Sequence, residues 1–182
     1  IKLFATLLNK GIPAAGNEQM LQQGLAIQTL YETRSAISGA SKKQWHELDI
    51  NQPLLQGSDI RISVTVSNES NRKTDNIALT IPVAAGMEIL AAIEQNDTDS
   101  KYDYRDLRDD RIHYYFPLKK GEAKTFQLMA NASFLGRYYQ PAISAEAMYD
   151  GNLQALSKGQ WIDIVKTLAI KPIEETQPKT VQ

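Results

Sequence analysis

The sequence predicts an all-β protein, an antiparallel β-sandwich in which one short segment is either a helix or a strand. Three observations predict this fold. Apolar and polar residues alternate along several segments, as they do in strands with one face in a core and one in water. Turn-forming residues separate these segments. The chain has 182 residues, 42% of them apolar and 23% charged, which suits a single domain with a substantial core.

The expected strands are the segments in which an apolar residue occupies every second position. The clearest are residues 60–66, 77–83, 112–118 and 126–130. Residues 3–7 and 25–31 are further candidates, and residues 162–168 form a last strand with weaker alternation. Turn residues lie between them at 11–13, 16–17, 56–59, 68–71, 119–122 and 151–152. The polar stretch 34–44 is expected to be the tip of a hairpin.

Two prolines limit the pairing of the predicted strands. Pro82 and Pro117 lie within or at the end of alternating segments, and proline has no amide hydrogen to donate to a neighbouring strand. Each strand is therefore expected to end at its proline, or to lie at a sheet edge there.

Residues 84–94 are the segment that fits the all-β interpretation least well. Their alanine, leucine and glutamate content favours a helix after Gly86, but a buried strand is an equal alternative. We expect one domain over residues 1–170. Residues 171–182 are polar and contain proline, and are expected to be a flexible C-terminal tail. Because the sequence starts at Ile1 without a methionine, we interpret it as a piece of a longer protein.

The composition excludes several classes of function. The chain has no cysteine, so it offers no disulfide, no thiol nucleophile and no cysteine-bound metal. Its 20 basic and 21 acidic residues give a net charge of −1, which argues against nucleic acid as a partner. The apolar runs are much shorter than the roughly 20 residues of a membrane span. No cofactor is expected.

The sequence gives little material for catalysis. It has only two histidines, His46 and His113, and no Gly-x-Ser-x-Gly motif. The segment after His46 begins like a zinc-binding helix, but position 50 is isoleucine where the second histidine ligand would be needed. His113 falls in a predicted strand on the face opposite Tyr114, which makes it a solvent-side residue. We therefore expect that the protein is not an enzyme.

An acidic and basic run lies between residues 103 and 111, with four aspartates and three arginines in nine residues. A calcium loop needs clustered oxygen ligands without cations between them, so calcium binding is the weaker alternative here. Arginine can bind two carboxylate oxygens at once, which suits an irregular loop held by ion pairs. The residues expected to form this structural ion-pair loop are Asp106, Arg108, Asp109, Asp110 and Arg111.

The segment 136–151 is rich in aromatic residues and leads into a polar loop. Tyr138 and Tyr139 are expected to point to opposite sides of a strand. Met148, Tyr149 and Asp150 mark a corner between strand and loop, and we identify them as a candidate contact with another surface. The simpler alternative is a tyrosine whose ring packs internally while its hydroxyl binds a backbone group.

Several segments agree in order and spacing with one known family. They are GLAI at residues 24–27, the strand at 57–66, IPVAAGME at 81–88, DLRDDR at 106–111, GRYYQP at 136–141 and AEAMYD at 145–150. Together they resemble the C-terminal macroglobulin-like domain of bacterial alpha-2-macroglobulins. The resemblance extends over residues 1–168 and implies an antiparallel β-sandwich within a much longer chain.

The resemblance also implies a function. Such parent proteins are periplasmic, are commonly anchored to the inner membrane through an N-terminal lipid, and inhibit endopeptidases by trapping them. Some carry a thioester in a separate helical domain with a Cys-x-x-Gln motif, which is absent from this segment. In those members the last domain shields the thioester, and Met148 and Tyr149 match the contact. The implied partners are other domains of the same chain, target proteases and a class A penicillin-binding protein. A second hypothesis is a protein-interaction β-sandwich that binds an envelope partner, such as a penicillin-binding protein complex.

Overall fold

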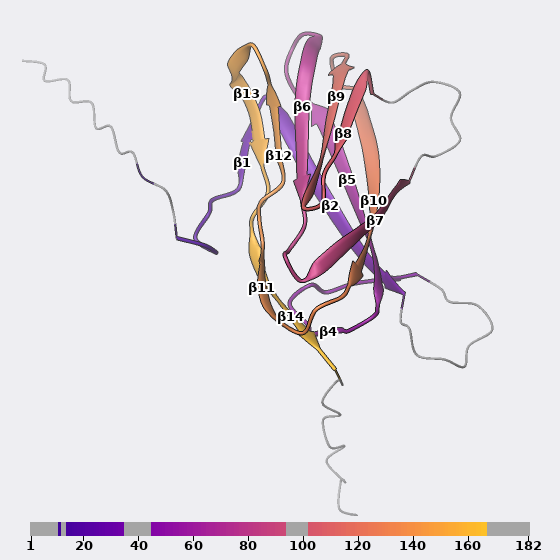
Figure 1. Ribbon diagram of the computed structural model, residues 1–182. Helices are drawn as coiled ribbons and strands as arrows, with labels where there is room; N and C mark the ends of the chain where they lie inside the picture. The colour runs from indigo at the N-terminus through magenta and orange to yellow at the C-terminus, as the bar shows by residue number, and fades with distance from the viewer. Residues whose placement is uncertain (1–10, 12–13, 35–44, 94–101, 167–182) are drawn as a thin grey trace, which may run out of the picture.

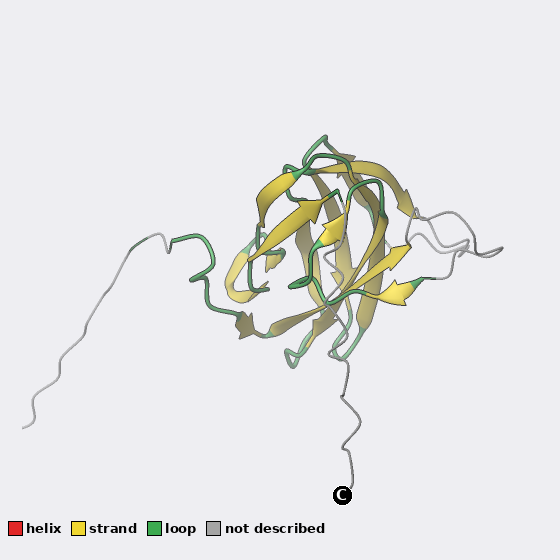
Figure 2. Cartoon of the chain, turned by 90° about the horizontal axis from the view of Figure 1, so that it is seen from below, coloured by secondary structure: helices red, strands yellow, loops and turns green. Residues whose placement is uncertain are grey.

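The computed structural model describes residues 11, 14–34, 45–93 and 102–166. All regular structure in these residues is β-strand, so the all-β prediction is confirmed (Figure 1). Within the described residues, fourteen strands form three sheets of six, five and three strands. Figure 2 shows strands joined by loops, with no helix in the described part of the chain. These residues accordingly contain no helix long and apolar enough to cross a membrane.

The first large sheet has six strands, and every neighbouring pair in it is antiparallel. In spatial order they are β1 (Leu21–Gln23), β13 (Asp150–Leu156), β12 (Ser144–Ala147), β6 (Thr74–Pro82), β9 (Arg111–Leu118) and β8 (Tyr104–Leu107). Strand β6 lies in the interior of this sheet. The turn after β8 lies at the end of β6 that carries Pro82, because Pro82 pairs with Arg111. The turn after β12 lies toward the other end of β6, because Ala147 pairs with Ile77.

The second large sheet has five strands and is also antiparallel. Its order is β3 (His46–Glu47), β2 (Leu25–Arg34), β5 (Asp59–Asn68), β10 (Ala123–Ala132) and β7 (Met87–Ile93). The small sheet contains β11 (Gly136–Gln140), β14 (Gln160–Val165) and β4 (Leu54–Leu55). There β4 pairs with β14 in parallel.

The two large sheets face each other across one core. The alternating apolar residues of β5 and β10 meet those of β6 and β9, as the sequence pattern predicted. Phe126 of β10 lies between Tyr114 and Phe116 of β9, with ring centroids 4.6 Å apart in both pairs. Buried residues from both sheets line this layer, among them Ile60, Ile62, Val64, Ile77, Leu79, Ile81, Ile112 and Leu128.

Residues 87–93, for which a helix and a strand were equal alternatives, form strand β7. The helix is therefore wrong there. Pairing with β10 satisfies the backbone of β7 along an existing edge, and Met87 is buried in the core, so tertiary contacts outweigh helix propensity. Gly86 stands just before β7 because a side chain there would collide with the ring of Tyr138.

Both prolines lie where their strands lose a partner. Pro82 is the last residue of β6. Pro117 lies beyond Tyr115, where the pairing between β9 and β8 ends, so β9 forms the sheet edge at that residue. The expectation drawn from the missing amide hydrogens is therefore confirmed. The predicted strand at 3–7, the tail at 171–182 and, beyond Arg34 of β2, the hairpin tip predicted at 34–44 lie outside the described residues.

Strand β6 contains an irregularity that shapes the region near β12. Its pairing with β9 shifts between Thr74 and Ile77, and Asn76 within this shift has a positive φ of 54°. Asparagine tolerates this left-handed conformation better than most residues with a side chain. The carbonyl of Asn76 accepts a hydrogen bond of 3.0 Å from the amide of Met148, so the bulge supports the turn after β12.

Replacement of Asn76 by valine is expected to lower the free energy of unfolding by about 1–2 kcal/mol, because a β-branched residue is strained in the left-handed region. Replacement by glycine, which adopts this conformation freely, is the matched control and should leave stability nearly unchanged. Urea unfolding of both variants measures the difference. Equal stability of the two variants would contradict the argument.

Candidate functional site

An exposed apolar turn connects β12 to β13. Met148 and Tyr149 form the turn, since Ala147 on one side pairs with Asp150 on the other. Met148 is 51% exposed and Tyr149 is 84% exposed. Tyr149 therefore does not follow the simpler alternative of a tyrosine whose ring packs inside. Tyr138 follows it instead, because its ring packs on the core and its hydroxyl donates to the carbonyl of Leu135 at 2.9 Å.

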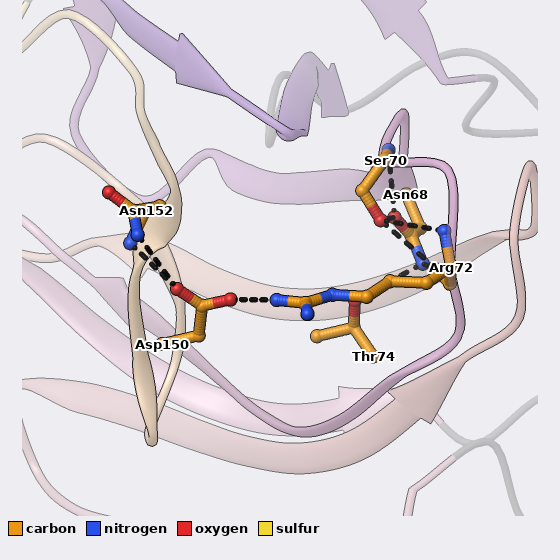
Figure 3. A network of polar contacts seen from close by, with 6 residues as sticks. All are labelled: Asn68, Ser70, Arg72, Thr74, Asp150 and Asn152. Atoms are coloured by element: carbon orange, nitrogen blue, oxygen red, sulfur yellow. Dashed lines mark hydrogen bonds and ion pairs between the residues drawn. The ribbon is translucent and has the colours of Figure 1, made fainter.

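A network of polar contacts holds the base of this turn (Figure 3). Asp150 accepts hydrogen bonds from the backbone amide and the side-chain amide of Asn152 through Oδ1, at 3.1 and 3.3 Å. Its other oxygen, Oδ2, accepts a hydrogen bond from the guanidinium of Arg72 and forms an ion pair with it. Arg72 comes from the loop between β5 and β6. Two loops that are distant in sequence are thus joined by one ion pair beside the turn.

The loop that carries Arg72 is organised by Asn68, whose exposed fraction is only 1%. The Asn68 side-chain amide donates to the carbonyls of Arg72 and Leu118 at 2.9 and 3.2 Å and to the hydroxyl of Thr74 at 3.3 Å. Its carbonyl oxygen accepts from the amide and the hydroxyl of Ser70 at 3.0 and 2.6 Å. Every polar atom of this buried side chain has a partner, as burial requires.

A shallow hollow lies between the two loops. Lys73 borders it as a second cation, and its ammonium group donates to Asp75 at 2.7 Å, which raises the pKa of Lys73. This amine is therefore paired with a residue at the start of β6 and does not bridge to the β12–β13 hairpin. The residues that line the hollow are Arg72, Lys73, Thr74, Asp75, Ala147, Tyr149, Asp150 and Leu153.

The acidic and basic run forms the hairpin between β8 and β9, at the other end of β6. Arg108 pairs with Asp106 at 2.8 Å, and the Arg108 amide donates to the carbonyl of Arg111 at 2.9 Å. Arg111 pairs with Asp110 at 2.6 Å, and its guanidinium lowers the pKa of that carboxyl. Asp109 is exposed at the tip. These ion pairs are local and open to solvent, and they do not approach Met148 or Tyr149.

The histidines lie apart in the fold. His46 is in β3, at the edge of the five-stranded sheet, and His113 is in β9 of the six-stranded sheet. The ring of His113 shares a 3.0 Å hydrogen bond with the hydroxyl of Thr80 on the neighbouring strand. Among the described residues there is no group of three or more histidines or carboxylates arranged to hold a metal ion.

The fold and the exposed turn make this protein a β-sandwich domain that presents an apolar hairpin tip at its surface. Comparison with known proteins identifies its family. The family model of the bacterial alpha-2-macroglobulin MG10 domain matches residues 26–152. The chain therefore belongs to this family. No curated protein matches the sequence.

Solved structures agree with the fold. The native conformation of E. coli alpha-2-macroglobulin matches with a TM-score of 0.67 and 17% identity, over 85% of this chain and 10% of that chain. Salmonella alpha-2-macroglobulin reacted with methylamine matches at 0.65 and 18%, over the same shares. An E. coli fragment from domain MG7 to the C-terminus matches at 0.64 and 14%, over 82% of this chain and 24% of that one. The chain thus spans about a tenth of the length of the complete relatives.

The polar support of the turn was not found from the sequence. Residues 68–71 and 151–152 were predicted only as turns, and nothing in the local pattern joins them. Arg72 and Asp150 are 78 positions apart, and only the strand order brings them together. The one available signal was an asparagine or aspartate two residues before a polar residue in each turn, which is typical of side chains that bind their own backbone.

Replacement of Asn68 by alanine is expected to lower the free energy of unfolding by about 1–3 kcal/mol, because buried partners of its amide lose their hydrogen bonds. Replacement by aspartate should be worse, since a carboxylate would face the carbonyls of Arg72 and Leu118. Thermal unfolding of both variants measures this. Wild-type stability of Asn68→Asp would show that the Asn68 contacts do not matter.

Replacement of Arg108 or Asp106 by alanine is expected to leave thermal stability nearly unchanged, because their ion pair is solvent-exposed and local. Differential scanning calorimetry at low and moderate salt measures it. A large loss of stability, or a melting temperature that rises with added calcium, would contradict this interpretation of the loop.

Proposed function

We propose that this chain is a non-catalytic, C-terminal domain of a bacterial alpha-2-macroglobulin that traps and inhibits endopeptidases. In this proposal the Met148–Tyr149 turn packs against a neighbouring domain of the same chain. The observation that carries it is the exposure of these two apolar side chains on a domain that belongs to the MG10 family.

The exposed Met148–Tyr149 turn leaves apolar surface in water, which a packing contact would remove. An aromatic side chain can bury about 150–250 Å² in a contact, and each Å² of apolar surface removed from water contributes roughly 25 cal/mol. Burial of Tyr149 alone is thus worth on the order of several kcal/mol before ordering costs. An exposed Met–Tyr pair at a hairpin tip is well suited to contact a second surface.

In a parent that carries a thioester, the proposed contact also protects that group. An activated acyl group survives only while water and amines are kept away from it, and methionine and tyrosine side chains exclude them. The Salmonella relative has been solved after reaction with methylamine, a small amine nucleophile. A Cys-x-x-Gln motif elsewhere in the complete gene would decide whether this parent belongs to the thioester-bearing group.

The remaining parts of the proposal follow from the family resemblance. The parent would be periplasmic, anchored to the inner membrane through an N-terminal lipid, and associated with a class A penicillin-binding protein. The second hypothesis, an interaction sandwich that binds an envelope partner, uses the same exposed turn. A stable envelope partner captured by the isolated domain, and lost when Tyr149 is replaced, would favour that hypothesis.

Replacement of both Met148 and Tyr149 by alanine in a thioester-bearing parent is expected to increase the rate of reaction with methylamine by roughly tenfold or more, because the acyl group loses its cover. Release of the free thiol, followed with a chromogenic disulfide reagent, measures the rate. Leu107→Ala is the matched control, since Leu107 is similarly exposed but lies at the opposite end of β6. An unchanged rate in the double variant would reject the shielding role.

A further inference from the structure

The ion pair between Arg72 and Asp150 joins two hairpin loops at the base of the exposed turn (Figure 3). We propose that Arg72 is a positioning residue, which fixes through Asp150 the direction in which Met148 and Tyr149 are presented to the neighbouring surface. This inference rests on the proposed function, because it explains how the contact residues are held ready for it.

The Arg72 end of the pair starts from a fixed point. Its carbonyl accepts a hydrogen bond from the buried side-chain amide of Asn68 at 2.9 Å. Asn68 is in turn bound to Leu118 of β9, within the six-stranded sheet. The backbone from which the arginine side chain extends is therefore held by the core, although the side chain itself is 63% exposed.

The Asp150 end is also arranged in advance. Two donors from Asn152 occupy Oδ1 and set the orientation of the carboxylate, so Oδ2 is turned toward the guanidinium. The Asp150 side chain is 25% exposed, much less than that of its partner. The backbone of Arg72 and the carboxylate of Asp150 are both held by other hydrogen bonds. Formation of the ion pair therefore orders little more than the Arg72 side chain, which favours one defined geometry.

The hairpin needs such a contact on its returning strand. On the β12 side, Ala147 pairs with Ile77 and the amide of Met148 binds the carbonyl of Asn76. On the β13 side the register shifts, because Glu146 pairs with Gln154 while Ala147 pairs with Asp150. The ladder is thus interrupted directly after the turn. Arg72 supplies a contact at that interruption, one residue from Tyr149.

The effect of the Arg72–Asp150 ion pair on the position of the turn can be measured separately from its effect on the global stability of the domain. An ion pair with an exposed arginine contributes little to global unfolding. Its loss should instead increase local opening of the turn, which hydrogen exchange detects as a subglobal event. The amide of Met148 is a suitable reporter, since it exchanges only when its hydrogen bond to Asn76 opens.

The test compares Arg72→Ala, Arg72→Lys and Lys73→Ala in the full-length protein that carries this domain. Hydrogen exchange at residues 148–150 is followed by mass spectrometry together with the melting temperature. We expect about two- to fivefold faster exchange in Arg72→Ala with an unchanged melting temperature, as for the loss of an exposed ion pair. Partial recovery is expected in Arg72→Lys. Lys73→Ala, which removes a cation from the same hollow but leaves the bridge intact, should match wild type.

The outcomes separate this inference from the function on which it rests. Unchanged exchange in Arg72→Ala, or equal acceleration in Lys73→Ala, would overturn the positioning role. Faster exchange in Arg72→Ala supports it, and in a thioester-bearing parent this variant should also react faster with methylamine. If Arg72→Ala loosens the turn while Tyr149→Ala leaves methylamine reactivity unchanged, Arg72 still positions the turn, and the shielding function is rejected.

Discussion

The contact of Phe126 with Tyr114 and Phe116 is the interaction on which the rest of the structure depends. It joins β10 of one large sheet to β9 of the other, with ring centroids 4.6 Å apart in each pair. Since β9 pairs with β6, and β6 pairs with β12, this contact fixes the position of the hairpin that carries Met148 and Tyr149. The exposed turn therefore lies two strands away from a closely packed layer of the core.

Two kinds of residue lie near one another around the turn: residues that hold its supporting loops in place, and exposed residues that are proposed to contact another domain. Asn68 is buried, has every polar atom in use and organises its loop from within the sheet. Arg72 and Asp150 lie at the boundary and transmit that order outward. Met148 and Tyr149 are exposed and belong to the MG10 region matched by the family model. The buried member of this group thus organises its loop, and the two residues proposed to make the contact lie exposed.

The long strands were predictable because their physics is local. Residues 60–66 and 112–118 have one face in the core, so their alternation is visible in the sequence. Residues 87–93 were ambiguous because their alanine, leucine and glutamate favour a helix while a short apolar run also suits a buried strand, and only the edge of β10 decided between the two. Short strands such as β3 and β4 carry too few residues for any period. The ion pair between Arg72 and Asp150 depends on strand order, which local patterns do not contain.

The register shift in β13 has a consequence for how such a domain adapts. An uninterrupted ladder would tie the conformation of the turn to every residue along the hairpin. Here the ladder is interrupted between the Ala147–Asp150 pair and the Glu146–Gln154 pair. The turn is therefore a local unit bounded by Ala147 and Asp150. The two side chains between these boundaries can be exchanged for others without a change in the buried layers. The conformation of the tip is thus set locally, by Arg72, Asn76 and the two residues that bound the turn, while the sandwich supports it from below.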